Sequence, residues 1–276
     1  MKRWFHIYVY GHWHIALCAA VLFAGGILLS GSAPSLPSLV YVYASTLVVY
    51  TLHRHMASAG LNPDINTYRY TFVNESIVLT RWIIALGSCV SLLAFFFLSV
   101  THQYVFIACG LLSTWYVLPI IFKKRIRDIG IWKLVVISIV WGVLPSLGYI
   151  EKEGLNKHAL LLMLEHSFFI FALTIPFDIK DQQMDEDADI SNLANTLGSH
   201  KSYQLILALS ISAILVSIGL YYLQVYTNLG LICTLMFYVV LYRLCSIKSP
   251  RSELYYLFGL DGLILIKGLI LPLSIW

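Results

Sequence analysis

Charged residues are scarce in this chain of 276 residues. Asp, Glu, Lys and Arg together make up 12% of it, whereas 59% of its residues are hydrophobic and its mean hydropathy is +0.79. A soluble domain carries about a quarter charged residues, which keep its surface compatible with water. The shortage of charge therefore excludes an ordinary water-soluble globule and indicates a protein that folds in lipid.

Paired cysteines and basic stripes are also missing. A disulfide framework or a zinc site needs clustered cysteines, and none of the five here forms a CxxC pair. The net charge of +4 is too small, and the basic residues too dispersed, for nucleic-acid binding. The cysteines all fall in apolar stretches, at Cys18, Cys89, Cys109, Cys233 and Cys245.

What the sequence does contain is long apolar runs. A helix needs roughly 20 mostly apolar residues to cross a bilayer. Stretches of nearly this length predict an all-α, polytopic membrane bundle of about nine transmembrane helices, which we expect to form a single domain over residues 1–276. The predicted spans are residues 13–30, 36–52, 82–99, 104–122, 132–150, 159–177, 205–223, 229–245 and 254–275.

The positions of Lys and Arg predict how these spans are oriented. With the N-terminus in the cytoplasm, fifteen of the eighteen basic residues lie on the cytoplasmic side, Lys152 and Lys157 lie outside, and Lys267 lies within the last span. Cytoplasmic loops of membrane proteins carry such an excess of positive charge. We therefore expect a C-terminus on the outer side and, since no organelle address is recognisable, a bacterial inner membrane.

The densest cluster of charge begins where the sixth apolar run ends, with six acids in residues 178–189. Asp178, Asp181 and Asp185 are spaced i, i+3 and i+7, so that a continuing helix would project all three from one face. Clustered carboxylates repel one another unless a cation lies between them, and Mg²⁺ prefers such oxygen ligands. A solvated acidic loop is the alternative interpretation.

A basic cluster follows the fourth apolar run. Lys123, Lys124 and Arg125 come shortly after Pro119. Three neighbouring cations can hold a diphosphate through charge-assisted hydrogen bonds. The alternative interpretation is an anchor of the kind that the cytoplasmic ends of membrane helices commonly carry.

Together these segments resemble the UbiA superfamily of intramembrane prenyltransferases. Residues 178–185 read Asp-Ile-Lys-Asp-x-x-x-Asp and are followed by Asn-Thr-Leu-Gly at 195–198, which is similar to the superfamily's second aspartate-rich motif. Residues 116–124, Tyr-x-x-Pro-x-x-x-Lys-Lys, resemble its Tyr-x-x-Pro…Lys-Arg segment. The long loops predicted after the second and sixth helices also agree with this fold.

The resemblance implies a UbiA-like bundle that transfers an isoprenyl group, with Mg²⁺, from an isoprenyl diphosphate to an aromatic or lipid acceptor within the membrane. It assigns catalysis and Mg²⁺ binding to Asp178, Asp181 and Asp185. For the diphosphate, the expected binding residues are Lys123, Lys124, Arg54, Lys180 and Tyr116.

The superfamily's first motif, Asn-x-x-x-Asp-x-x-x-Asp, is degenerate here. Tyr50 stands in place of the Asn, Arg54 in place of the first Asp and Ser58 in place of the second. A guanidinium group cannot ligate Mg²⁺ but can bind a phosphate through two hydrogen bonds. Asp64, in the following loop, offers an oxygen ligand. Two alternatives therefore stay open: a relative that binds isoprenoid lipid without transferring it, and a small transporter.

Two ionisable residues, Glu165 and Lys267, fall inside predicted spans at a similar depth, roughly 10 Å from the outer boundary at 1.5 Å per helical residue. An unpaired charge at this depth is costly. We therefore predict that the two residues form an ion pair that joins the sixth helix to the ninth.

Overall fold

A computed structural model describes residues 2–58, 72, 75–117, 130–187, 191–247 and 251–275 of the chain. Within these ranges the chain forms helices joined by short turns, and it forms no strand there. The predicted all-α class is confirmed for this part of the chain.

The first half of the chain contains the helices α1 (Lys2–Tyr10), α2 (Trp13–Leu29), α3 (Leu36–Ser58), α5 (Ile77–Phe95) and α6 (Val100–Val117). α1 and α2 meet at a bend of 60°, where His12 has a φ of 65° and so leaves the right-handed helical region. α2 ends at a Schellman turn, in which Gly31 has a φ of 73° and the Ser32 N–H bonds to the Ile27 carbonyl at 3.2 Å. The chain continues through Pro34 without helical structure, and α3 begins at Leu36.

In the second half, side-chain caps mark the starts of two long helices. The Asn156 side chain accepts a hydrogen bond from the Ala159 N–H at 2.8 Å, and the Thr227 hydroxyl accepts one from the Gly230 N–H at 3.3 Å. The helices of this half are α7 (Gly130–Val143), η2 (Leu144–Ser146), α8 (Leu147–Glu153), α9 (Lys157–Lys180), α10 (Gln182–Asp187), α11 (Leu193–Leu197), α12 (Ser199–Tyr222), α13 (Asn228–Cys245), the π-helical η3 (Tyr255–Leu260), α14 (Gly262–Ile270) and η4 (Leu271–Ser274).

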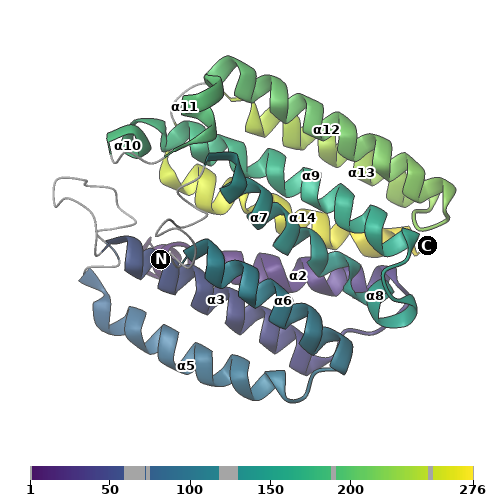
Figure 1. Ribbon diagram of the computed structural model, residues 1–276, viewed down its shortest axis with the longest axis horizontal. Coiled ribbons are helices and arrows are strands. Elements are labelled where there is room, and N and C mark those ends of the chain that lie inside the picture. The colour runs from purple at the N-terminus through teal and green to yellow at the C-terminus, as the bar shows by residue number, and fades with distance from the viewer. Residues whose placement is uncertain are drawn as a thin grey trace.

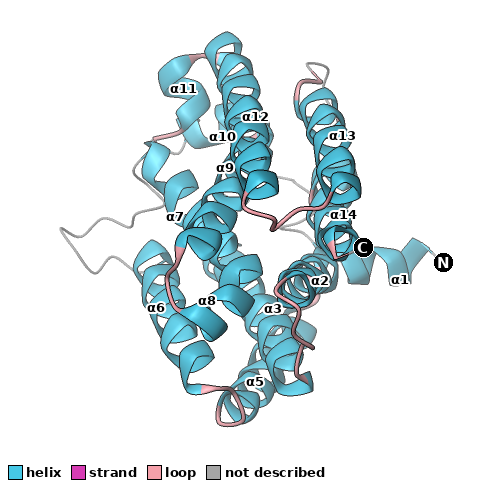
Figure 2. Ribbon diagram, turned by 90° about the vertical axis from the view of Figure 1, so that its right-hand side faces the viewer, coloured by secondary structure: helices cyan, strands magenta, loops and turns pink. Residues whose placement is uncertain are grey.

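Helices that are neighbours in sequence pack side by side, and the last long helix also packs against the first. α2 packs on α3 and α3 on α5, while α6 packs on α7 and the series continues through α9, α12 and α13 to α14. α14 returns to α2, and α8 contacts both α2 and α6. α10 and α11 lie at one end of the bundle, with α8 and the C-terminus at the other (Figure 1). Figure 2 shows the same bundle closer to end-on.

Helix α2 lies in backbone contact with two neighbours. A Cβ atom at Gly25 would lie 2.1 Å from the carbonyl oxygen of Gly268 in α14, and one at Gly26 would lie 2.2 Å from that of Pro145 in η2. Glycine at such positions lets membrane helices approach closely enough for extensive van der Waals contact. The first long helix is thus enclosed by the last helix and by the break between α7 and α8.

The outer surface of the bundle is apolar. Leu86 and Leu93 of α5 and Leu215 of α12 have exposed fractions of 58%, 64% and 63%. An apolar surface of this extent is stable against lipid but not against water. Among the described residues, seven helices are long and apolar enough to cross a membrane, or eight if the bent α1–α2 pair counts as one span.

The span count of nine stays a prediction. The remaining expected span, residues 104–122, corresponds to α6, and its last residues lie outside the described part of the chain.

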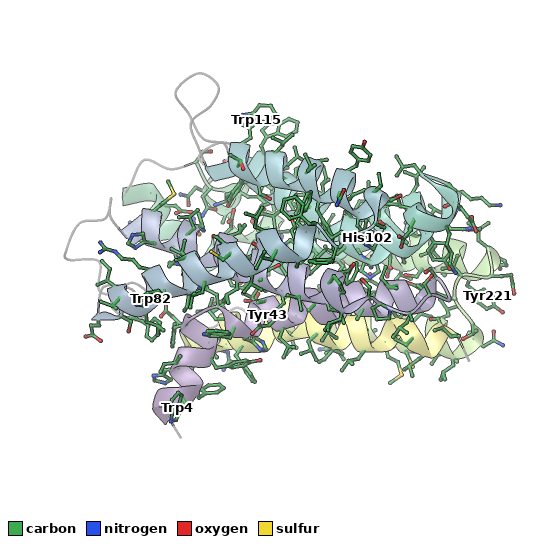
Figure 3. The ribbon with its side chains drawn as sticks, turned by 90° about the horizontal axis from the view of Figure 1, so that it is seen from below. Trp4, Tyr43, Trp82, His102, Trp115 and Tyr221 are labelled. Carbon is green, nitrogen blue, oxygen red and sulfur yellow. The ribbon has the colours of Figure 1, made fainter. Side chains whose placement is uncertain are left out.

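Aromatic side chains mark both ends of the bundle. Trp4 and Trp82 lie towards one end and Tyr221 lies at the opposite end, whereas His102 lies between them (Figure 3). Trp and Tyr are enriched at the two interfaces of a membrane, where an apolar ring can also keep a polar atom hydrated. The distribution agrees with a bundle whose helices cross the bilayer from end to end.

The predicted ion pair between Glu165 and Lys267 is confirmed. The Lys267 Nζ lies 2.8 Å from the Glu165 Oε1, and both side chains are fully buried. The ammonium group also donates to the Thr234 hydroxyl at 3.4 Å. The pair joins α9 to α14, and Thr234 adds α13 to the contact.

Further polar groups complete the shell around the Glu165 carboxylate, among them the His166 ring, whose Nδ1 lies 3.0 Å from the Glu165 Oε2. The hydroxyl groups of Tyr238, Tyr226 and Ser217 donate to the carboxylate at 2.5, 2.8 and 3.1 Å. Burial and the adjacent carboxylate raise the pKa of Tyr226, in the α12–α13 turn, well above its ordinary value. Its phenol therefore stays protonated and available as a donor. This network ties α9, α12, α13 and α14 together at one depth.

We expect Lys267→Met to destabilise the protein by about 3–5 kcal/mol, because it leaves the Glu165 carboxylate charged and buried without its cation. Thermal unfolding of the detergent-purified protein measures the change. The double variant with Glu165→Gln should recover part of the loss, since no charge then remains. Lys201→Met, at an exposed lysine of α12, is the control. A Lys267→Met protein as stable as the wild type would contradict a stabilising role.

Candidate active site

The acidic segment is divided between two helices. α9 passes through Pro176 and ends at Lys180, and α10 begins at Gln182. Asp181 lies between them with φ −88° and ψ 5°, outside regular helical geometry. Asp178 therefore belongs to the last turn of α9, whereas Asp185 belongs to α10.

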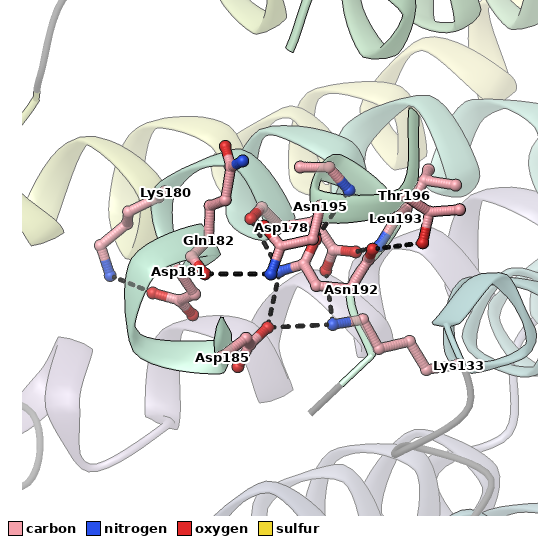
Figure 4. A network of polar contacts seen from close by, with 11 residues as sticks. Lys133, Asp178, Lys180, Asp181, Gln182, Asp185, Asn192, Leu193, Asn195 and Thr196 are labelled. Carbon is pink, nitrogen blue, oxygen red and sulfur yellow. Dashed lines mark hydrogen bonds and ion pairs between the residues drawn. The ribbon is translucent and has the colours of Figure 1, made fainter. Parts of the chain in front are cut away.

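Lys133 brings these two carboxylates together. It lies in the first turn of α7, and its Nζ is 2.9 Å from the Asp178 Oδ1 and 3.4 Å from the Asp185 Oδ2 (Figure 4). The three side chains have exposed fractions of 12%, 6% and 13%. Charge pairs this well shielded from water interact more strongly than pairs at an open surface. One cation position is thus shared by two carboxylates from different helices.

The start of α11 holds the same two carboxylates from the other side. The Asn192 amide donates to the Asp185 Oδ2 at 2.6 Å and to the Asp178 carbonyl at 2.9 Å, and the Leu193 N–H donates to the Asp178 Oδ2 at 3.1 Å. Asn192 also caps α11, because its Oδ1 accepts from the Ala194 N–H at 2.7 Å. A carboxylate in the last turn of a helix is disfavoured by the helix dipole, and these donors with Lys133 offset that cost for Asp178.

A second ion pair lies beside the first. The Lys180 Nζ is 3.2 Å from the Asp181 Oδ1 and 3.6 Å from the Glu253 Oε1. It also lies 5.4 Å from the centre of the Tyr256 ring, within the range of a cation–π contact. Lys180 thereby links the end of α9 to the segment that leads into η3.

The expectation that Asp178, Asp181 and Asp185 share one face is corrected by this arrangement. The helix that would have aligned them ends at Lys180, so Asp181 pairs with Lys180 while Asp178 and Asp185 meet around Lys133. Within the described ranges, no group of three or more His, Cys, Asp and Glu side chains is arranged to hold a metal ion.

Of the residues expected to bind diphosphate, Tyr116 lies on α6, beside α3. The Tyr116 ring is 5.9 Å from the His53 ring on α3, measured between ring centres. Arg54 follows His53 on α3 and is partly exposed. Tyr116 therefore lies next to the helix that carries Arg54.

Three expected site residues lie outside the described part of the chain. They are Lys123 and Lys124, in the basic segment after α6, and Asp64, in the loop after α3.

Lys133 and Asn192 are site residues that the sequence analysis did not identify. Lys133 was counted only among the basic residues of the cytoplasmic side. A lysine in the first turn of a helix is nevertheless unusual, since the helix dipole favours an anion there, and this was a signal that an acidic partner is close. Asn192 follows the acidic run by a few residues, and it resembled an ordinary cap.

The oxygen donors fit a magnesium ion that is shared with a phosphate group. Mg²⁺ in proteins is commonly held by one or two carboxylates together with water and substrate phosphates. Asp178 and Asp185 provide two such carboxylates, and both already contact a single cationic group, the Lys133 ammonium. The residues are therefore of the type and number that Mg²⁺ requires, although Lys133 competes for the same oxygens.

Solved structures of UbiA homologues have the same fold. A UbiA homologue from Aeropyrum pernix K1 in its apo form aligns with a TM-score of 0.68 at 14% identity, covering 95% of this chain and 96% of that one. A homologue from Archaeoglobus fulgidus bound to GPP and Mg²⁺ aligns with a TM-score of 0.62 at 12% identity, with coverage of 95% and 96%. A digeranylgeranylglyceryl phosphate synthase structure aligns with a TM-score of 0.64 at 15% identity, covering 99% of both chains.

A search of curated proteins finds no match. The family model described as the UbiA prenyltransferase family matches residues 75–258, which include α5 to α13 and the acidic segment. The match begins after α3, so the degenerate first motif lies outside it. With most of its length matched by this model, the chain belongs to the UbiA prenyltransferase family.

Proposed function

We propose that this chain, as one domain, transfers an isoprenyl group from an isoprenyl diphosphate to a hydrophobic aromatic or lipid acceptor inside the membrane. The observation that carries the proposal is the shielded pair of carboxylates, Asp178 and Asp185, around a single cation position at the end of the bundle. UbiA homologues with bound GPP or DMAPP and Mg²⁺ support this substrate class.

The leaving diphosphate is the group that needs most stabilisation. When the bond between the allylic carbon and the diphosphate oxygen breaks, the electron pair stays on the diphosphate and the carbon becomes a cation. Positive groups preorganised around the diphosphate lower the barrier to this step. We assign this role to Lys133, to Arg54 and, in the basic segment, to Lys123 and Lys124, with Tyr116 as a hydrogen-bond donor.

Asp178 and Asp185 are the residues that would hold Mg²⁺. A bound magnesium ion would supply further positive charge to the departing diphosphate. Asp181 pairs with Lys180, so we give these two residues a supporting role at the edge of the site. Asp64 remains a candidate oxygen ligand from the loop after α3.

Aromatic rings near the site suit an allylic cation. Tyr50, one helical turn before Arg54 on α3, lies 6.3 Å from Trp141 on α7, measured between ring centres. Ring faces attract cations without providing a nucleophile. An acceptor that enters from the lipid would then meet the cation where water is excluded, and its own proton would be lost after the new bond forms.

A second function is favoured by one specific observation. The first-motif position carries Arg54 instead of a carboxylate, and Lys133 occupies the space between the remaining two carboxylates. A site with this excess of cations can hold an isoprenyl diphosphate or a polyprenyl phosphate without activating it. The alternative is therefore a UbiA-family protein that binds isoprenoid lipid and does not transfer it.

Diphosphate release separates the two functions. We expect the purified protein with Mg²⁺, isoprenyl diphosphates of several lengths and a panel of quinone-precursor and lipid acceptors to release diphosphate and form a prenylated product. Asp178→Asn and Asp185→Asn should each lower the rate by about 100-fold or more, because each removes a charge that positions the leaving group. Product is measured by mass spectrometry and diphosphate by a coupled assay.

Glu186→Gln is the matched control, since Glu186 is an exposed acid next to Asp185 in α10. It should retain the wild-type rate. If the wild-type protein binds the isoprenyl diphosphate but releases no diphosphate with any acceptor, the transferase proposal is wrong and the lipid-binding alternative is favoured.

We also propose that the N-terminus and the acidic segment face the cytoplasm of a bacterial inner membrane, with the C-terminus outside. The location of α10 and α11 at the end opposite α8 supports their lying on opposite sides of the membrane (Figure 1), and the excess of Lys and Arg on the side of the acidic segment supports a cytoplasmic location for it. Alkaline phosphatase fused at the C-terminus, or inserted at Gly154 in the α8–α9 turn, should be active because it is exported. The same reporter inserted near Asn195 should be inactive, and activity there would reverse the proposed orientation.

A further inference from the structure

The candidate site contains a cation that belongs to the chain itself. Lys133 is held within 3.4 Å of two carboxylates, and its side chain is only 12% exposed. A surface lysine would instead keep its ammonium group in water and make one loose contact. Lys133 thus stands at the point where the two carboxylates converge, which is also the point that a divalent ion would use.

We propose that Lys133 is the resident cation of this site, and that a divalent ion binds there strongly only together with diphosphate. In the free protein the ammonium group neutralises Asp178 and Asp185. When a diphosphate arrives, its oxygens provide new acceptors for the ammonium and new ligands for the metal ion. This inference rests on the proposed function, because it assumes that the site receives a diphosphate.

Electrostatics gives the direction of the effect. Two carboxylates carry two negative charges, and one ammonium cancels half of that charge before any metal binds. A divalent ion that approached the same oxygens would be repelled by the ammonium in a region where water screens poorly. A diphosphate adds enough negative charge for the ammonium and the metal ion to be bound side by side.

The carboxylates do not depend on Lys133 alone for their positions. Asp185 also accepts from Asn192 at 2.6 Å, and Asp178 also accepts from the Leu193 N–H at 3.1 Å. Replacing Lys133 with a neutral residue of similar length therefore leaves each carboxylate with a donor. We expect such a variant to fold and to expose the two carboxylates to an added metal ion.

Mn²⁺ is a suitable probe, because electron paramagnetic resonance reports the free ion directly. In the full chain purified in detergent without diphosphate, we expect Lys133→Met to bind Mn²⁺ at least about tenfold more tightly than the wild type, since a repulsive charge has been removed. Lys133→Arg should resemble the wild type. Lys201→Met changes the net charge by the same amount at an exposed position and should also resemble it.

A second measurement needs no variant. With the free Mn²⁺ concentration held constant, inorganic pyrophosphate should raise Mn²⁺ binding to the wild-type protein, and should raise it less in Lys133→Met. Equal Mn²⁺ affinity of the wild type and Lys133→Met would overturn the proposal. So would tight Mn²⁺ binding to the wild type that pyrophosphate does not change.

These readouts are independent of prenyl transfer. A protein that transfers isoprenyl groups but binds Mn²⁺ with the same affinity in all variants would refute only the role of Lys133. A protein with the expected Mn²⁺ behaviour and no transfer would retain that role and support the lipid-binding alternative.

Discussion

The contact between Lys133 and the two carboxylates of Asp178 and Asp185 is the interaction on which the end of the bundle that carries the candidate site depends. It joins the first turn of α7 to the last turn of α9 and to α10. Removing charges from water is costly, so a shielded cluster of this kind persists only where every member has partners. Asn192 and Leu193 supply the remaining donors, and α11 is fixed in position by the same bonds.

The bundle contains two polar centres with different properties. Around Glu165 the partners are complete: a lysine, three hydroxyl groups and the His166 ring surround one fully buried carboxylate, and four helices meet there. The cluster around Lys133 is partly exposed, and its single ammonium group is shared between two carboxylates. A saturated network favours rigidity, whereas a partly accessible one can exchange a partner for a ligand. The first centre therefore stabilises the scaffold that holds the second.

Sequence reasoning was most successful where a prediction needs only the local sequence or the depth of a residue in the membrane. Hydrophobic run length located the helices, and the similar depth of Glu165 and Lys267 predicted their pairing before any packing was known. The acidic motif was also recognised, but its geometry was not. The break between α9 and α10 falls at Asp181, where the sequence has no Gly or Pro to indicate that a helix ends. The spacing of the three Asp residues therefore predicted a common face that the structure does not contain.

The sequence analysis mainly failed to identify contacts between residues that are far apart in the chain. Lys133 precedes Asp178 by more than forty residues, and only the packing of α7 against α9 brings them into contact. A lysine near the cytoplasmic end of a span is already explained by the positive-inside rule, and the unusual first-turn position of Lys133 does not by itself identify the acidic partner. Asn192 was hidden for a similar reason, because its capping of α11 already accounts for an asparagine at that position.

The backbone contact between Gly25 and Gly268 has a consequence for biosynthesis. Since α2 leaves the ribosome well before α14, the face of α2 that carries Gly25 cannot be covered by its partner until α14 has been synthesised. His14 lies on the same early helix and finds its acceptor, the Phe258 carbonyl at 3.2 Å, only in the final segment. The packing of α14 against α2 is thus a late, long-range event in folding. A chain truncated before α14 would leave Gly25 of α2 without the backbone that it contacts.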